Sequence, residues 1–272
     1  MAAGPAGRRL AVLGHPVAHS RSPAMQNAAL RELGLGGWSY EAIDVPPDRF
    51  EELVRSLPES GFAGANVTVP HKGAALTVAE ELSEVAREVG AANTLAFEDG
   101  VVHAYNTDAA GLLAALPEPP EGRRALVLGA GGAARAVVWA LVREGARVDV
   151  WNRTALRSSN LCEELGGSVV EEPDAGGYEL IVNSTAVGLG GEDPFRELPL
   201  TRGGLHAGQT VVDLVYGAEP TVLAQAAREA GAQTVDGIEV LIRQGAESLR
   251  IWTGREPPID TMRAAARATA PN

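Results

Sequence analysis

The side chains best suited to chemistry lie in three polar segments, each of which follows an apolar run of the chain. They are residues 19–23 (His-Ser-Arg-Ser-Pro), 66–72 (Asn-Val-Thr-Val-Pro-His-Lys) and 106–108 (Asn-Thr-Asp). In open α/β sheets, ligands gather at the ends of such strands. Hydroxyls and an amide suit a small polyhydroxylated substrate, and the candidates to hold one are Ser20, Ser22, Thr68 and Asn93.

Three of these residues also have a structural interpretation. Lys72 is expected at the start of a helix, where its charge opposes the helix macrodipole. That energetically unfavourable placement indicates a functional role, although a surface lysine is the more common explanation. Ser22 and Asp108 would each serve as a helix N-cap. Taken one at a time, the functional and structural interpretations are about equally good.

A glycine-rich turn, Gly129-Ala130-Gly131-Gly132-Ala133-Ala134, follows an apolar strand and opens a helix. The glycines permit a tight turn and a close approach of backbone to a pyrophosphate, and the helix N-terminus supplies unpaired N–H groups. Because strand and helix flank the turn as the fingerprint requires, it predicts a dinucleotide site. The alternative is a glycine-rich turn without a ligand.

The residues about 20 positions further on favour NADP over NAD. An NAD site carries an acidic residue there for the ribose 2′-hydroxyl. This chain has Asn152-Arg153-Thr154 instead, with Arg157 one helical turn later. Guanidinium groups pair with a 2′-phosphate, which a carboxylate would repel. In the alternative interpretation Thr154 is only an N-cap and the arginines are solvated surface.

The elements around these residues predict an α/β fold with two domains. Residues 1–107 plus 238–272 are expected to form a mixed-sheet domain for substrate and catalysis, and residues 108–237 a Rossmann-like parallel-sheet domain for NADP. Helices are expected at 22–33 (Ser22 as N-cap), 50–57, 133–144, 155–165, 221–230, 239–252 and 260–268, the last two packing back on the first domain. Strands are expected at 10–13, 65–69, 94–97, 101–104, 125–128, 147–150, 168–170, 180–183 and 210–215, with a last strand ending at 236.

Composition excludes several classes of protein. The net charge of −12 argues against a nucleic-acid surface. Cys162 is the only cysteine, so no internal disulfide can form. The histidines lack metal-ligand spacing, and no apolar stretch is long enough for a membrane span or a signal peptide. We expect a cytoplasmic protein without a metal; the sequence leaves the oligomeric state open, with a homodimer as one candidate.

Taken together, the motifs resemble the shikimate dehydrogenase family. The matching segments run in order through nearly the whole chain and are residues 14–23, 66–72, 90–94, 106–108, 129–133, 152–154, 183–185, 213–216 and 236–237 with Gln244. The resemblance implies NADP-linked reduction of 3-dehydroshikimate to shikimate, a step of aromatic amino acid biosynthesis. No nucleic-acid or membrane partner is implied.

The resemblance also implies roles for individual residues. Lys72 and Asp108 would be the catalytic pair, in which Lys72 donates the proton or stabilises the developing alkoxide and Asp108 orients it. The substrate would be held by Ser20, Ser22, Thr68, Asn93, Tyr216 and Gln244. The cofactor would be held by Gly129, Ala130, Gly131, Gly132, Ala133, Asn152, Arg153, Thr154 and Arg157, with Glu84, Leu214 and Gly237 near the nicotinamide.

The chain departs from the family pattern at three places, none of which involves the proposed proton-transfer pair. Gln26 replaces the usual histidine, Leu189 replaces the usual methionine, and residues 217–221 displace the usual proline. Two other functions remain open: a dehydrogenase for quinate, used alone or beside shikimate and with NAD, and a binding protein that has lost catalysis. A folate-type methylene dehydrogenase would share the two-domain plan, but its N-domain signature is not found.

Overall fold

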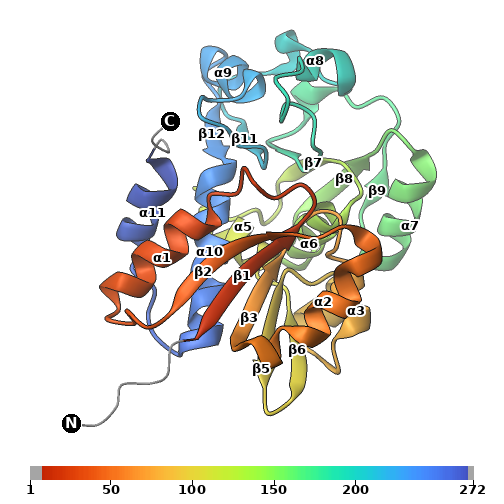
Figure 1. Cartoon of the computed structure of the whole chain (residues 1–272). Coiled ribbons are helices and arrows are strands. Elements are labelled where there is room, and N and C mark those ends of the chain that lie inside the picture. Colours follow the sequence, from red (N-terminus) through yellow and green to blue (C-terminus); the bar gives the residue numbers. More distant parts are fainter. Residues whose placement is uncertain (1–7, 269–272) are drawn as a thin grey trace. The chain divides into compact units, whose positions relative to one another are not determined.

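Two six-stranded sheets form the framework of residues 8–268, the part of the chain that the computed structural model describes (Figure 1). They belong to two compact units. Unit 1 comprises residues 8–111 and 241–268, and unit 2 comprises residues 112–240. The chain leaves unit 1 within α5 (Asp108–Ala115) and returns to it within α10 (Gly237–Thr253). None of the helices in residues 8–268 has the length and apolar character needed to cross a bilayer.

The sheet of unit 1 is mixed. Its order is β2-β1-β3-β5-β6-β4, in which β1 pairs in parallel with β2 and β3 while β5 runs antiparallel to β3 and β6. The predicted hairpin is present, because Asp99 and Gly100 both take the positive φ that its two-residue turn needs. The strands are β1 (Arg9–Gly14), β2 (Ser39–Asp44), β3 (Phe62–Val67), β4 (Glu81–Leu82), β5 (Thr94–Glu98) and β6 (Val101–Tyr105).

Side chains of β3 alternate between the two faces of this sheet. Ala65 and Val67 pack into an apolar core with α2 (Phe50–Ser56), α3 (Ala74–Val78) and α4 (Glu84–Val89). Gly64 faces α10 instead, and a Cβ there would lie 2.2 Å from Nε1 of Trp252. The same Nε1 donates to the backbone O of Leu95 on β5 at 2.8 Å. The missing side chain at Gly64 therefore lets α10 pack directly on the sheet.

The C-terminal helices pack on the first unit, as predicted. Figure 1 shows α1 (Ser22–Glu32) beside α11 (Ile259–Arg267). Three side chains hold these ends together: Arg21 donates to the backbone O of Ala268 at 3.1 Å, Arg255 donates to that of Leu33 at 2.5 Å, and the Thr261 hydroxyl donates to the Glu32 carboxylate. Two segments from opposite ends of the described chain, residues 8–111 and 241–268, thus complete one fold.

The sheet of unit 2 is entirely parallel, in the order β12-β11-β10-β7-β8-β9. On β7, Ala125 and Val127 pack against α5, α6 and α7, while Leu126 and Leu128 face α9, so helices cover both faces. The strands are β7 (Arg124–Leu128), β8 (Arg147–Trp151), β9 (Ser168–Val169), β10 (Leu180–Asn183), β11 (Thr210–Asp213) and β12 (Gln233–Asp236). The helices are α6 (Gly132–Arg143), α7 (Ala155–Leu165), α8 (Pro194–Glu197) and α9 (Val222–Glu229).

Several local predictions were wrong. Asp108 is the first helical residue of α5 and not its N-cap, and β11 ends at Asp213, two residues before the predicted end. The N-cap of α1 is Arg21, and Ser22 is already helical, because Ser20 Oγ accepts a hydrogen bond from Ser22 N at 3.3 Å. Strand β3 ends at Val67, two residues before the predicted end, and Val69 is exposed. Lys72 lies in the turn before α3, whose N-cap is Gly73, and not at the helix start.

Candidate active site

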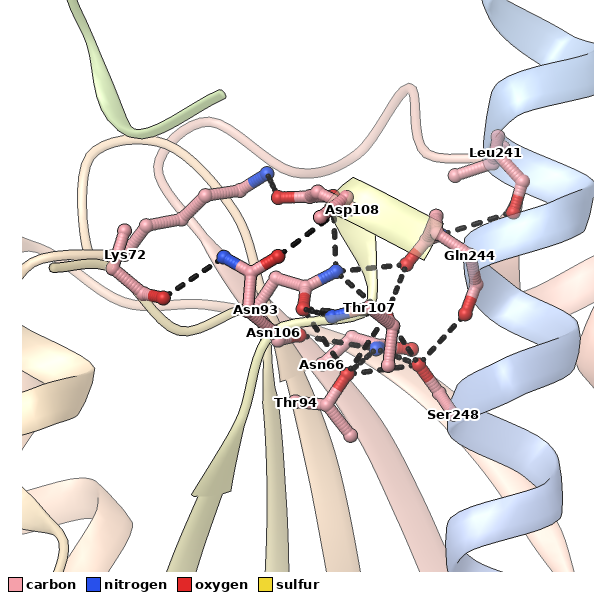
Figure 2. Close-up of polar contacts among 12 residues, drawn as sticks. Asn66, Lys72, Asn93, Thr94, Asn106, Thr107, Asp108, Leu241, Gln244 and Ser248 are labelled. Atoms are coloured by element: carbon pink, nitrogen blue, oxygen red, sulfur yellow. Dashed lines mark hydrogen bonds and ion pairs between the residues drawn. The ribbon is translucent and has the colours of Figure 1, made fainter. Parts of the chain in front are cut away.

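Lys72 and Asp108 form an ion pair in unit 1. Nζ of Lys72 lies 2.5 Å from Oδ2 of Asp108, and 13% and 17% of the two side chains remain exposed (Figure 2). The pair is therefore shielded but still open to a small molecule. The turn carrying Lys72 is tied to the segment before β5, because Ala92 N donates to Lys72 O at 2.9 Å. Asn106 Oδ1 accepts from Ala109 N, so Asn106 satisfies the first turn of α5 and the Asp108 carboxylate points to the lysine.

Lys72 is the only lysine of the chain, since the other 22 of its 23 basic residues are arginines. A guanidinium stays charged throughout the accessible pH range, whereas an ammonium can give up its proton. Lys72 therefore differs from every other basic side chain of Lys or Arg type in this sequence, and it contacts a shielded carboxylate. This signal is visible in the sequence without any resemblance and points to proton transfer at this position.

Asn93 joins the ion pair to α10. Its Nδ2 lies 2.9 Å from Oδ1 of Asp108 and 3.0 Å from Oε1 of Gln244, and its Oδ1 accepts from Thr107 N at 2.7 Å. The backbone N–H of Thr107 can only donate, which fixes the orientation of the Asn93 amide. Four of the residues predicted for the site, Lys72, Asp108, Asn93 and Gln244, are therefore linked by direct contacts (Figure 2).

A further group of buried polar side chains adjoins these four residues, and we call it the inner polar cluster. Ser248 Oγ lies 2.8 Å from Thr94 Oγ1 and 3.2 Å from Thr107 Oγ1, and it receives a hydrogen bond from Asn66 Nδ2 at 2.9 Å. At most 5% of any of these side chains is exposed. Its members are Asn66, Thr94, Thr107 and Ser248. Sequence reasoning assigned no role to any of them.

Ser20, Ser22 and Thr68 lie in neighbouring turns of unit 1. Thr68 N donates to Leu13 O at 2.8 Å, and a Cβ at Gly14 would lie 2.4 Å from Thr68 Cγ2, so these two turns need a glycine where they meet. Ser22 is buried and Ser20 partly so. Within residues 8–268 no hydrogen bond links these three side chains to Lys72 or Asp108, and their contact with substrate stays a prediction.

The glycine-rich turn of unit 2 has the geometry of a dinucleotide loop. Gly129 has a φ of +112°, and a Cβ there would lie 2.8 Å from Ser184 Oγ, so no other residue fits. A Cβ at Gly131 would meet no atom within 4 Å, which leaves open space on the side where a phosphate would pass. No side chain caps α6, so its first N–H groups point outward for an anion. The turn fits a pyrophosphate.

The turn lies at the point where the strand order of the sheet reverses. The chain continues from β7 to β8 and β9 on one side and to β10 on the other. Ser184, which follows β10, donates from its hydroxyl to Leu128 O at 2.6 Å and lies against the turn. Ligands of doubly wound sheets bind at this switch point.

The predicted 2′-phosphate residues follow β8, beside the turn. Gly129 N donates to Trp151 O at 2.7 Å, which places the end of β8 next to the glycines. Asn152 Nδ2 donates to Thr154 O at 2.9 Å and closes the loop. Thr154 occupies the N-cap position of α7 without a side-chain capping bond. Arg153 and Arg157 are exposed, and neither forms an ion pair with another described residue, so both cations are available to a phosphate.

The loop after β11 brings Leu214 and Gly237 together, because a Cβ at Gly237 would lie 2.4 Å from Leu214 O. Tyr216 follows in the same loop and is partly buried. Glu84 belongs to unit 1, where it is exposed in the first turn of α4. The roles of these four residues stay predictions.

Asp213 holds this loop and was missed as a functional residue. Its carboxylate, 2% exposed, accepts hydrogen bonds from Thr221 Oγ1 at 2.6 Å, Asn183 Nδ2 at 2.9 Å and Val215 N at 3.2 Å. Burial raises the pKa of the Asp213 carboxyl, and the three hydrogen bonds lower it by less. Asp213 and Asn183 are register partners at the ends of β11 and β10. An acidic residue at the end of an otherwise apolar strand was the available signal.

Comparisons with known proteins agree with this geometry. A family model described as the shikimate dehydrogenase substrate binding domain matches residues 12–95. Models described as shikimate / quinate 5-dehydrogenase and shikimate 5′-dehydrogenase C-terminal domain match residues 115–181 and 237–267.

Individual relatives extend the similarity over almost the whole chain. Shikimate dehydrogenase (NADP(+)) of Methanothermobacter thermautotrophicus is 43% identical over 92% of this chain and 93% of its own. The enzyme of the same name from Anaeromyxobacter sp. strain Fw109-5 is 46% identical over 94% and 95%. The crystal structure of shikimate 5-dehydrogenase from Thermus thermophilus, in complex with NADP(H) and shikimate, is 43% identical, covers 96% of this chain and 98% of that one, and has a TM-score of 0.88. The chain belongs to the shikimate dehydrogenase family.

Proposed function

We propose that the chain catalyses the reversible, NADP-dependent reduction of 3-dehydroshikimate to shikimate, with Lys72 and Asp108 as its proton-transfer pair. The observation that carries the proposal is the shielded contact of 2.5 Å between Nζ of the only lysine and Oδ2 of Asp108. The names of relatives 43–46% identical over more than nine tenths of the chain support the substrate and the cofactor.

The residues of unit 1 would hold the substrate and move one proton. Lys72 Nζ donates a proton to the carbonyl oxygen as it becomes a hydroxyl, and in the reverse direction it takes that proton back. Asp108 holds the ammonium through Oδ2, while its Oδ1 is fixed by Asn93. Asn93 Nδ2 donates to Gln244 Oε1, which holds both amides beside the ion pair, where the neighbouring hydroxyls of the substrate would lie. This network keeps the proton donor in place before the substrate arrives.

The residues of unit 2 would hold NADP, which supplies or accepts the hydride when it is bound. The N–H groups at the start of α6 receive the pyrophosphate, and Gly131 leaves room for it. Arg153 and Arg157 pair with the 2′-phosphate. We propose that unit 1 is the substrate unit and unit 2 the cofactor unit.

Steady-state kinetics of two Lys72 variants test the proposal. In Lys72→Ala we expect kcat for shikimate oxidation to fall by about 10²-fold or more with KM little changed, because the ammonium acts on the reacting oxygen. Lys72→Arg keeps the charge but cannot release a proton, so it should fail similarly if proton transfer is the role and retain activity if only charge is needed. A kcat for Lys72→Ala within about tenfold of wild type, a barrier change of ~1.4 kcal/mol, would exclude Lys72 as the proton-transfer residue.

A labelling experiment tests substrate binding without turnover. Lys72 carries the only side-chain amine of the chain, so reductive methylation can modify no other side chain. We expect saturating shikimate to slow this modification, with mass spectrometry as the readout. Equal rates with and without shikimate would show that Lys72 does not lie at the substrate.

The competing assignment to quinate is tested by assaying shikimate and quinate, each with NADP and with NAD. We expect the shikimate–NADP pair to have the highest kcat/KM. If quinate with NAD had a higher kcat/KM than shikimate with NADP, the substrate and cofactor assignment would be overturned. The location of the site would be unaffected.

A further inference from the structure

The inner polar cluster has no part in the chemistry proposed above, yet it is buried more completely than the site that it adjoins. Ser248 and Thr94 are 0% exposed, Thr107 is 1% exposed and Asn66 is 5% exposed. Buried polar groups cost free energy unless they are hydrogen-bonded, and none of the side-chain N or O atoms of these four residues lacks a partner. The cluster is thus fully connected, which is the condition under which a polar network fixes a single arrangement of its members.

The direction of the hydrogen bonds around Ser248 follows from which atoms can only donate or only accept. Asn66 Nδ2 is a donor, so Ser248 Oγ accepts from it at 2.9 Å. The backbone O of Gln244 is an acceptor, so the single hydroxyl proton of Ser248 goes to it at 3.0 Å. Tyr40 OH donates to Asn66 Oδ1 at 2.7 Å and fixes the Asn66 amide in turn.

These bonds connect α10 to the sheet directly behind the site. Asn66 lies on β3 and Thr94 on β5, whereas Ser248 lies on α10 one turn after Gln244 (Figure 2). The rotation of α10 about its axis determines where the Gln244 side chain points. In the observed rotation Gln244 Oε1 lies 3.0 Å from Asn93 Nδ2, and Gln244 Nε2 donates to Leu241 O at 3.0 Å.

We propose that Ser248 is a positioning residue for substrate binding: it anchors α10 to β3 and β5 in the rotation that brings Gln244 to Asn93. It does so without touching the substrate. The inference rests on the proposed function, because it concerns the affinity of this site for shikimate. A serine buried among four polar partners holds the helix in one rotation, whereas apolar contacts alone would tolerate a small rotation.

Ser248→Ala tests this role, and Thr253→Ala is its matched control. Thr253 lies on the same helix and makes the same kind of bond, from Oγ1 to the backbone O of Leu249 at 2.7 Å, but it has no contact with the cluster. We expect Ser248→Ala to raise KM for shikimate about five- to tenfold, with kcat changed less and KM for NADP unchanged, since the lost hydrogen bonds act through substrate binding. Thr253→Ala should leave both KM values near wild type.

The double variant Ser248→Ala/Gln244→Ala separates positioning from a merely structural role. If Ser248 acts through Gln244, the double variant should have the same KM for shikimate as Gln244→Ala alone. Equal KM values for Ser248→Ala and Thr253→Ala, or fully additive effects in the double variant, would overturn the inference. If Ser248→Ala does not fold, as judged by circular dichroism, Thr94→Val removes the neighbouring hydroxyl and is held to the same expectations. Wild-type turnover of shikimate is measured first, so failure of the proposed function is recognised separately.

Discussion

Gly111 offers a sharp test of how closely α5 and α10 must approach. It lies in α5, three residues after Asp108, and faces Gln244. A Cβ at this position would lie 2.6 Å from Gln244 Cβ, 2.7 Å from its N and 2.9 Å from its Cα. Real Cβ atoms do not approach other atoms so closely, and none of the three atoms belongs to the movable end of a side chain. Gly111→Ala therefore requires α10 to move.

Two opposing contributions determine how much Gly111→Ala changes the stability of the protein. An alanine within a helix is favoured over glycine by about 1 kcal/mol. Overpacking of a close contact costs about 1–3 kcal/mol, and a contact with backbone lies at the upper end because the backbone yields least. The free energy of unfolding should therefore fall by about 2 kcal/mol, which corresponds to a fall in Tm of about 5 °C. A retreat of α10 by about 0.5 Å would also stretch the 3.0 Å contact between Gln244 Oε1 and Asn93 Nδ2 to the limit of a hydrogen bond.

Thermal unfolding and shikimate kinetics measure both effects. We expect Gly111→Ala to lower Tm and to raise KM for shikimate by severalfold, with KM for NADP unchanged. Gly36→Ala is the control, because a Cβ at Gly36 meets no atom within 4 Å. A Tm for Gly111→Ala equal to or above that of wild type, together with an unchanged KM, would refute the close approach of the two helices.

Two further predictions concern unit 2. Replacing Arg153 and Arg157 by alanine should raise KM for NADP about tenfold and leave KM for NAD unchanged, because only NADP carries the 2′-phosphate; parallel losses with both cofactors would contradict that assignment. For Asp213, whose folded pKa is raised above its ordinary value of 3.8, the folded state holds the proton more tightly, so this group's contribution to stability is lost as pH rises from 3.8 through the folded pKa. The free energy of unfolding of wild type relative to Asp213→Asn, from urea titrations, should therefore be larger near pH 4 than at pH 7, meaning a more stable folded state at the lower pH; the opposite trend would contradict the raised pKa.

Much of the fold was predictable because its signals are local. The glycine turn with its flanking strand and helix, the Asp99–Gly100 hairpin and the alternation of strands and helices in unit 2 each depend on neighbouring residues. The end of β3 was misplaced because Val67-Thr68-Val69 has the β-branched composition of a strand, but Val69 has left the sheet and is exposed. Local propensity could not show where the neighbouring strands stop.

The candidate site was predictable in part. The polar strand ends made Lys72, Asp108 and Asn93 candidates, and the family resemblance implied their roles, before any contact was known. Ser248 carried no signal, because one serine in an amphipathic helix is ordinary in sequence. Its partner Asn66 is 182 residues away, and only the folded chain places the two side chains at 2.9 Å. Contacts of such separation depend on packing, which periodicity does not encode.

The discontinuous build of unit 1 has a consequence for the order in which the chain can fold during synthesis. Unit 2 is contained in one uninterrupted stretch, residues 112–240, and can form as soon as that stretch has left the ribosome. Unit 1 must wait for residues 241–268, because α10 covers the face of its sheet that carries Gly64 and Asn66. Until then that face is open to water, and Gln244 is missing from the site. We therefore expect a nascent chain to gain its proposed cofactor unit first and its substrate site last.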